Sequence, residues 1–391
     1  MVCVGVKRMI KPLFEAALMR ASTGYRIQKT VSDLILSGRY IELRSFLASE
    51  WEIITDKRFG EVKDNLPWRK KTYLLRILRD YTQFFGTFTE ALAARVSYQN
   101  FVHNSTPSWR RFLIRREQLQ IKLEGLTDSS LSHRAVNAGY SSTNPPKFIR
   151  REKPRNQAEK RAQRQFDHVI AGKKVLILGP APGASVTQDF VSQFDVLAIP
   201  KLHKGAWLGE GIEAQNHQIV VTYLNHQTVA RVVNEGSVST SEWRIARVKS
   251  VEDVEKLSRV LSSNDLHNRQ VGKMSSPGRL MMNDYGPFMG PAMVFDLLCA
   301  KPRRVYLAGF TFYVDREGKS YRDAYDSSNH ADAVLVEALR AHGAFSNFLF
   351  VKGLRQMGLV DVEDRLAPIL AMPSRDYADY LDARFDSVLK P

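Results

Sequence analysis

The sequence predicts an α/β protein: a Rossmann-like, mostly parallel sheet with helices on both faces and a lid loop, preceded by a mainly helical N-terminal region. From residue 173 onward, short apolar runs bounded by Gly or Pro alternate with helical patterns, as in parallel strands joined by helices. Before residue 140, apolar residues recur instead with the period of a helix, and no strand alternation is found.

Residues 1–140 are expected to form the helical region. A weak helical pattern over residues 33–47 is broken by Gly38. A stronger pattern between residues 74 and 92 places apolar side chains on one helical face: Leu74, Leu78, Tyr81, Phe85, Phe88 and Leu92. We therefore predict a helix over 74–92.

Residues 141–172 are predicted to be a basic linker and helix. The stretch 141–146 consists of Ser, Thr, Asn and Pro, which favour turns. Between Lys147 and Arg164 the chain carries eight Lys or Arg residues and only two Glu residues. Such a run is most simply a solvated face. The functional alternative is a landing patch for an anionic surface or acceptor.

Residues 173–391 are predicted to form the catalytic domain, with a lid at 311–329. Five strands are expected, at 173–179, 195–200, 218–224, 304–310 and 347–353. Helices are expected at 251–261, 291–299, 331–341 and 376–389. The acidic residues of the last helix are interpreted as a solvated face and not as a metal site: Asp376, Asp379 and Asp382.

The composition of the 391-residue chain limits the cellular setting and the classes of partner that we expect. Two cysteines give no disulfide framework, so a reducing, cytoplasmic setting is the default. No apolar run is long enough to span a bilayer. The formal net charge of +16 attracts anions, which include nucleic acid, anionic lipid and nucleotide sugars.

Two turns are candidates for binding a phosphorylated ligand. The loop from Gly179 to Ser185 follows a predicted strand and precedes a helix, where glycine admits a ligand and the helix start favours phosphate. It matches neither the dinucleotide fingerprint nor the Walker loop. In the second turn, Gly290 precedes Pro291, which suits the first turn of a helix.

The predicted lid carries the residues that could perform chemistry. Tyr313 and Tyr321 lie in this polar loop, at the carboxyl end of a predicted strand, and their hydroxyls could donate hydrogen bonds to a phosphate. His330 opens the next helix, and an imidazole can accept a proton near neutral pH. No motif of paired cysteines, histidines or aspartates predicts a metal site.

In this order, these parts resemble the bacterial sialyltransferases and their sialyltransferase-like relatives. The resemblance covers about residues 173–352. It rests on a strand and loop, KKVLILGPAPGAS, on a second strand, QFDVLAIP, and on a turn, helix and strand, FMGPAMVFDLLCAKPRRVYLAGFTFY. It continues with a lid element, GKSY, and with a histidine that opens a helix, NHADAVLVEAL.

The resemblance implies an inverting transferase that uses a CMP-sugar donor and needs neither a metal ion nor another cofactor. Two lid tyrosines of the family hold the donor phosphate, a role that falls on Tyr313 and Tyr321. The family's general base falls on His330, which would take the proton of the acceptor hydroxyl. The nucleotide would be held by the two turns, at Gly179, Pro180, Ala181, Gly183, Ser185, Met289 and Gly290.

Three positions depart from the family's pattern. Pro180 and Pro200 stand where asparagines are usual, and Met289 replaces a serine or threonine. The donor sugar is therefore open between sialic acid, Kdo and a related ulosonic acid, with a glycan or glycolipid as acceptor. Two alternatives stay open: a basic nucleic-acid-binding protein, and a catalytically degenerate membrane-surface protein. The location expected is the cytoplasm, with a possible contact between Lys147–Arg164 and the inner face of the membrane.

Overall fold

The computed structural model describes five main stretches of the chain. They are residues 86–105, 139–200, 219–259, 289–314 and 343–389, without 147–148, 152–153, 155, 182–185, 225, 236–244 and 249–250. A few single positions are described before residue 83 and between 336 and 340.

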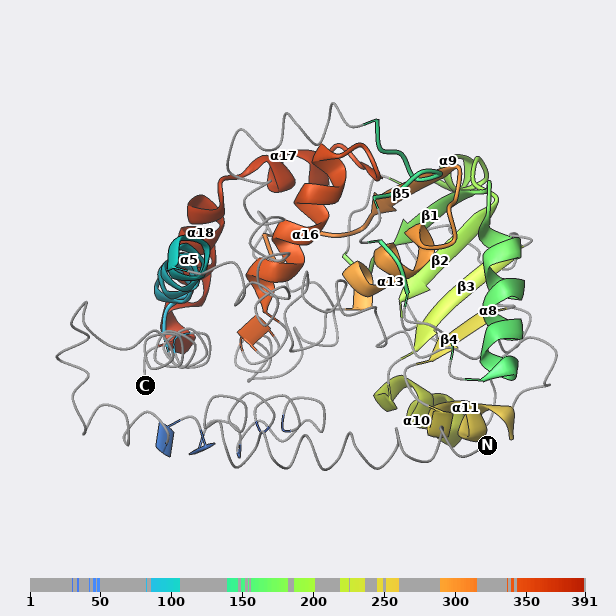
Figure 1. Cartoon of the computed structure of the whole chain (residues 1–391), viewed down its shortest axis with the longest axis horizontal. Helices are drawn as coiled ribbons and strands as arrows, with labels where there is room; N and C mark the ends of the chain where they lie inside the picture. The colour runs from blue at the N-terminus through green and yellow to red at the C-terminus, as the bar shows by residue number, and fades with distance from the viewer. Residues whose placement is uncertain are drawn as a thin grey trace.

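One sheet of six parallel strands forms the centre of the described structure (Figure 1). The strands lie in the order β4-β3-β2-β1-β5-β6. Their bounds are β1 Lys174–Leu178, β2 Val196–Pro200, β3 Ile219–Leu224, β4 Ile245–Val248, β5 Arg304–Ala308 and β6 Asp361–Val362. Every pairing in the sheet is parallel. The chain runs outward from β1 to β4 and then returns to the other side of β1, so the strand order reverses between β1 and β5.

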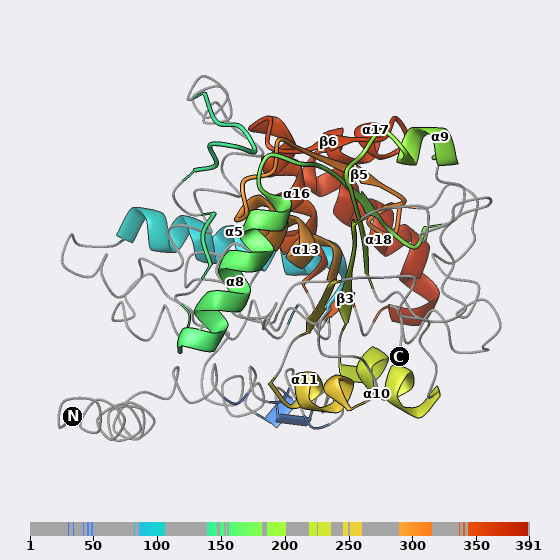
Figure 2. The ribbon, with the colours of Figure 1, turned by 90° about the vertical axis from the view of Figure 1, so that its right-hand side faces the viewer.

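Helices cover both faces of the sheet. On one face, alternate strand residues such as Val175 and Ile177 join a core with α8 (Gln157–Ile170), α13 (Met289–Leu298) and α16 (Ala344–Gln356). On the other face, Leu176 and Leu178 meet α9 (Gln188–Val191), α10 (His226–Glu235) and α11 (Val251–Ser258). In Figure 2, α8 and α13 lie to the left of the strands and α9 lies to the right. The predicted fold class, a Rossmann-like parallel α/β sheet, is thus confirmed.

The strands follow from continuous apolar runs. In β1 the segment Val175–Leu178 is buried throughout, as expected for a parallel strand covered on both faces. The predictions at 173–179, 195–200, 218–224 and 304–310 correspond to β1, β2, β3 and β5. Four-residue β4 and two-residue β6 were not predicted, because such short runs carry too little pattern.

The strand predicted over 347–353 is wrong, because these residues lie inside α16. The run is apolar enough for a buried strand, yet α16 is itself buried on nearly every side, with Phe348 and Leu354 fully covered. A short apolar run cannot distinguish a buried strand from a buried helix. The predicted helices at 251–261, 291–299 and 376–389 correspond to α11, α13 and α18 (Ser374–Leu389). Of the helix expected at 331–341, Val336, Leu339 and Arg340 are described, and they are helical.

The end of the basic segment forms part of helix α8, whose apolar side packs into the core. Asn156 caps its first turn by accepting the N–H of Glu159. One turn apart, Phe166 and Ile170 are fully buried against the sheet. The basic residues Lys160, Arg161 and Arg164 of α8 are exposed, as expected for a solvated face, while the opposite side of the helix packs into the fold.

The N-terminal helix α5 (Phe88–Ser105) packs against the C-terminal helix α18, as Figure 1 shows. Its start is a capping box, in which Thr87 Oγ1 accepts the N–H of Glu90 and Glu90 Oε2 accepts the N–H of Thr87. The Asp382 carboxylate accepts the N–H groups of Phe88 and Thr89. Hence one continuous helix over 74–92 is wrong, because a new helix begins at Phe88. The solvated role given to Asp382 is wrong too.

The rest of the predicted helical region, including 33–47, lies largely outside the described residues. A short helix, α17 (Leu366–Ala371), joins β6 to α18. None of the helices in the described part of the chain is both long and apolar enough to cross a bilayer.

Candidate functional site

The carboxyl ends of β1 and β5 form the candidate site. Ligands of open α/β sheets bind outside the carboxyl ends of the strands, at the point where the strand order reverses. In this sheet the reversal lies between β1 and β5. The loops that leave these two strands begin with Gly179 and Gly309, and together with the start of α13 they build the site.

Gly179 and Gly309 allow the two chain segments to approach more closely than any other residue would permit. The N–H of Gly179 donates to Ala308 O at 2.7 Å, and the N–H of Ala181 donates to Gly309 O at 3.0 Å. A Cβ atom on Gly179 would lie 2.2 Å from Gly309 O. The close backbone approach expected at Gly179 is therefore made here by the chain itself.

The start of α13 joins this junction. A Cβ atom on Gly290 would lie 2.5 Å from the ring of Phe310, the residue after Gly309. The helix α13 begins one residue earlier, at half-buried Met289. Three glycines that stand far apart in the sequence thus meet around one aromatic ring at the carboxyl edge.

The loop after β5 has an unusual backbone. Gly309 has φ +71°, which suits glycine, but Phe312 and Tyr313 adopt φ +47° and φ +63°. Bulky residues rarely occupy this left-handed region, at a cost of about 1–3 kcal/mol each. The turn is closed by the N–H of Val314, which donates to Thr311 O at 2.9 Å. Such conformations persist only where the surroundings hold them.

Two elements hold this loop. The Tyr377 hydroxyl on α18 donates to Phe312 O at 3.0 Å, and the Tyr377 ring stacks on Phe348 with centroids 4.1 Å apart. On the other side, the N–H of Gly309 donates to Glu363 Oε1 at 2.6 Å. Burial raises the pKa of Tyr377 far above its usual value, so the hydroxyl stays protonated as a donor. The loop therefore carries Tyr313 in a fixed backbone conformation.

The described residues of the predicted site lie in this junction. Gly179, Ala181 and Gly290 are buried, while Pro180 and Met289 are half-buried. Tyr313 is also half-buried and packs against the apolar core. Pro200 is the last residue of β2. The other predicted residues, Gly183, Ser185, Tyr321 and His330, lie outside the described residues, as does the lid beyond Val314.

A buried charge cluster, not predicted from the sequence, lies between α8, α13 and the sheet. Asp296 of α13 accepts from Arg151 Nε at 2.6 Å and from Arg247 Nη2 at 2.7 Å. It also accepts the Tyr223 hydroxyl at 3.0 Å. Arg151 pairs in addition with Asp167 of α8. The cluster joins β3, β4, α8 and α13 around one carboxylate.

Burial governs the protonation of this cluster. Burial alone would lower the pKa of Arg151, but the nearby carboxylate of Asp296 raises it above its usual value. Burial, and next the charge of Asp296, raises the pKa of Tyr223 well above its usual value. Arg151 is therefore charged and Tyr223 neutral at physiological pH, which suits a structural brace. The sequence signal for it is Asp296 itself, a single acid inside the apolar helix MGPAMVFDLL.

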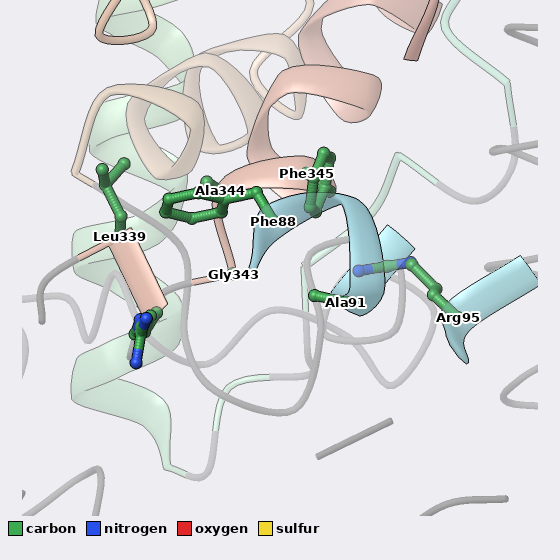
Figure 3. Close-up of a pocket in the computed structure, with 8 residues that line it drawn as sticks. Phe88, Ala91, Arg95, Leu339, Gly343, Ala344 and Phe345 are labelled. Carbon is green, nitrogen blue, oxygen red and sulfur yellow. The ribbon is translucent and has the colours of Figure 1, made fainter. Parts of the chain in front are cut away.

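A small hollow between α5 and the start of α16 is no ligand site. Phe88 and Arg95 of α5 line it together with Leu339 and Phe345, as Figure 3 shows. Its volume of about 20 Å³ has room for about one water molecule, far less than a nucleotide needs. Within the described ranges, no three side chains of the types that bind metals gather into a possible metal site.

Comparison with known protein families, with curated proteins and with solved structures finds no match for this chain.

Proposed function

We propose that the protein is an inverting, metal-independent glycosyltransferase that moves a sialic acid, Kdo or a related ulosonic acid from a CMP-sugar donor to a glycan acceptor. One observation carries the proposal: the loop after β1, the start of α13 and the loop with Tyr313 meet where the strand order reverses. The sequence points to each of the three separately, and this is the part of an open α/β sheet that binds ligands.

The proposed reaction follows from the chemistry of the donor. The acceptor oxygen attacks the anomeric carbon while the bond from this carbon to the phosphate oxygen breaks, and CMP leaves with the electron pair. The hydroxyls of Tyr313 and Tyr321 donate to the phosphate and stabilise the charge that develops on it. His330 takes the proton of the acceptor hydroxyl. The positive net charge favours binding of an anionic donor.

The packing of the glycines bears on which residues we propose to contact the nucleotide. Gly179 contacts Gly309, and Gly290 contacts Phe310, so neither glycine has space for a ligand beside its Cα atom. We therefore assign the nucleotide contacts to the loop beyond Ala181, at Gly183 and Ser185. This assignment also accommodates Pro180 and Met289, whose side chains differ from those usual in the family.

Thermal unfolding in the presence of CMP, CTP, UDP and GDP tests the donor class. A ligand present at 100 times its Kd stabilises the folded state by about 2.7 kcal/mol. We expect cytidine nucleotides alone to raise the melting temperature. Equal shifts with all four nucleotides, or no shift with any of them, would contradict the proposed donor.

Hydrolysis or transfer of a CMP-linked ulosonic acid tests the residues. His330→Ala should lower kcat about 100-fold or more, as expected for loss of a general base. The double variant Tyr313→Phe, Tyr321→Phe should lower turnover far more than stability. Tyr140→Phe, at an exposed tyrosine, is the matched control and should keep full activity. If His330→Ala keeps full transferase activity, the base is misassigned.

The proposed location is the cytoplasm, because the two cysteines provide no disulfide framework.

A further inference from the structure

Six exposed basic residues lie on α8 and on the turns that begin β1 and β5. We call this surface the basic face, and its members are Lys160, Arg161, Arg164, Lys173, Lys301 and Arg303. In Figure 2, α8 lies in front of α13 and β3, on the side that faces the viewer. The basic face is therefore on the outside of the described fold.

The exposed surface of α8 carries charge of one sign. Its two acidic residues, Glu159 and Asp167, are half-buried, and Asp167 pairs with Arg151. Lys160, Arg161 and Arg164 are all exposed, and among the described residues the structure gives none of them an acidic partner. By contrast, the exposed surface of α18 mixes Arg375 with acidic residues, and Arg375 pairs with Asp379 at 3.8 Å.

Backbone hydrogen bonds link α8 to the two turns. The helix ends at Ile170, its C-cap Ala171 donates its N–H to Asp167 O at 2.8 Å, and Lys173 follows two residues after Ala171. The N–H of Gly172 donates to Lys301 O at 3.1 Å, and that of Arg303 donates to Lys173 O at 2.8 Å. The three basic residues of the turns therefore lie together at the amino edge of the sheet, next to the end of α8.

The apolar side of α8 packs into the core of the protein. Phe166 and Ile170 are fully buried, so α8 cannot insert these side chains into another apolar phase. A partner of this surface must be recognised by charge, across a convex helix and two turns. A bilayer of anionic lipid presents such a partner, because its headgroups form a broad negative surface that attracts Lys and Arg.

An exposed tyrosine beside the basic face favours lipid over nucleic acid. Tyr140 is 37% exposed and stands two residues before Ser142, whose hydroxyl donates to Arg303 O at 2.9 Å. Tyrosine is enriched where a protein meets the headgroup layer of a membrane. Proteins that bind a single strand of nucleic acid hold it in a charged groove, where aromatic rings stack on the bases. The convex surface of α8 offers no such groove.

We propose that the basic face docks the protein on an anionic lipid bilayer. The face lies on α8 and at the amino edge, whereas the candidate site lies at the carboxyl edge. The five residues of β1 separate the two edges by about 16 Å. Docking therefore leaves the candidate site open, and the inference stands independently of the proposed transferase activity.

Vesicle sedimentation with the full chain tests this proposal. Vesicles of phosphatidylcholine with phosphatidylglycerol should bind the protein, and vesicles of phosphatidylcholine alone should not. Each Lys or Arg near an anionic surface strengthens binding about fivefold. The variant Lys160→Gln, Arg161→Gln, Arg164→Gln should therefore bind about 100-fold more weakly.

A matched control separates a specific surface from net charge. Lys256→Gln, Arg259→Gln, Arg375→Gln removes three exposed basic residues that lie outside the basic face, on or next to α11 and α18. It changes the net charge equally and should keep wild-type vesicle binding. Equal losses in both variants would overturn the proposal. So would binding of a short DNA duplex that depends on Arg161 and Arg164 while anionic vesicles are not bound.

Discussion

Arg150 and Arg151 are neighbours in the chain, yet Arg150 is exposed and the side chain of Arg151 is 8% exposed. The same contrast separates the charge cluster around Asp296 from the basic face of α8. In the cluster, every arginine has a carboxylate partner and a place in the core. On the basic face, all six cations stand in solvent. The basic segment from Lys147 to Arg164 thus supplies both Arg151 of the buried cluster and three exposed cations of the basic face.

The two regions differ in what a lost charge costs. A buried ion pair broken on one side leaves an uncompensated charge away from water, at a cost of about 3–5 kcal/mol. An exposed charge interacts weakly with its surroundings, and its loss changes stability by about 0.5 kcal/mol or less. Substitutions in each region test this difference in cost.

The largest effect is expected for Asp296→Ala. It leaves Arg151 and Arg247 buried without their shared carboxylate, and it should lower the free energy of unfolding by about 3–5 kcal/mol. Denaturant unfolding measures this loss. Asp189→Ala, at an exposed position on α9, is the control and should stay within about 0.5 kcal/mol of wild type. Similar values for both variants would show that the cluster is not a brace.

The neighbouring arginines provide the sharpest comparison. Arg151→Met removes one donor of Asp296 while Arg247 and Tyr223 remain, so a loss of about 2 kcal/mol is expected, in the range for hydrogen bonds to charged groups. Arg150→Met should change stability by about 0.5 kcal/mol or less. Both values come from the same denaturant experiment. Equal stability of the two variants would contradict the structural role that we assign to Arg151.

The different burial of Arg150 and Arg151 shows how far the sequence alone predicts the structure. The strands β1, β2, β3 and β5 were predicted because burial on both faces leaves a continuous apolar run. The apolar run that forms α16 was predicted to be a strand, because a fully buried helix also has a continuous apolar sequence. The glycines at 179 and 290 were selected as positions where a ligand could approach, whereas the structure places Gly309 and Phe310 of the chain itself against them, contacts that depend on strand order. Nothing in the run of basic residues distinguishes Arg151 from Arg150, because only the fold brings Asp296 beside one of them.

A pH titration of stability distinguishes the buried cluster in a second way. Tyr223 has a raised pKa in the folded protein, whereas in the unfolded chain it ionises near pH 10. Its contribution to stability is therefore complete below pH 10 and falls by about 1.4 kcal/mol per pH unit above it. The variant Tyr223→Phe has no hydroxyl to ionise, so it should not show this loss of stability above pH 10.

At neutral pH, Tyr223→Phe loses a hydrogen bond to a charged group, at a cost of about 1.5–3 kcal/mol. The difference between wild type and variant should stay constant below pH 10 and shrink above it. Unfolding curves of both proteins from pH 8 to 11 measure it. Parallel curves over the whole range would mean that Tyr223 ionises equally in both states.

The smallest effect on stability is expected for the variant Lys160→Gln, Arg161→Gln, Arg164→Gln. Because these side chains lie in solvent and repel one another, their loss should change the free energy of unfolding by about 0.5 kcal/mol or less, and removal of the repulsion favours a gain. Denaturant unfolding at low and high salt measures the change, which should diminish as salt screens the charges. A loss of several kcal/mol, unaffected by salt, would place these residues with Arg151 as parts of the brace. A stable variant that no longer binds vesicles would instead show that α8 holds the fold with one side and the partner with the other.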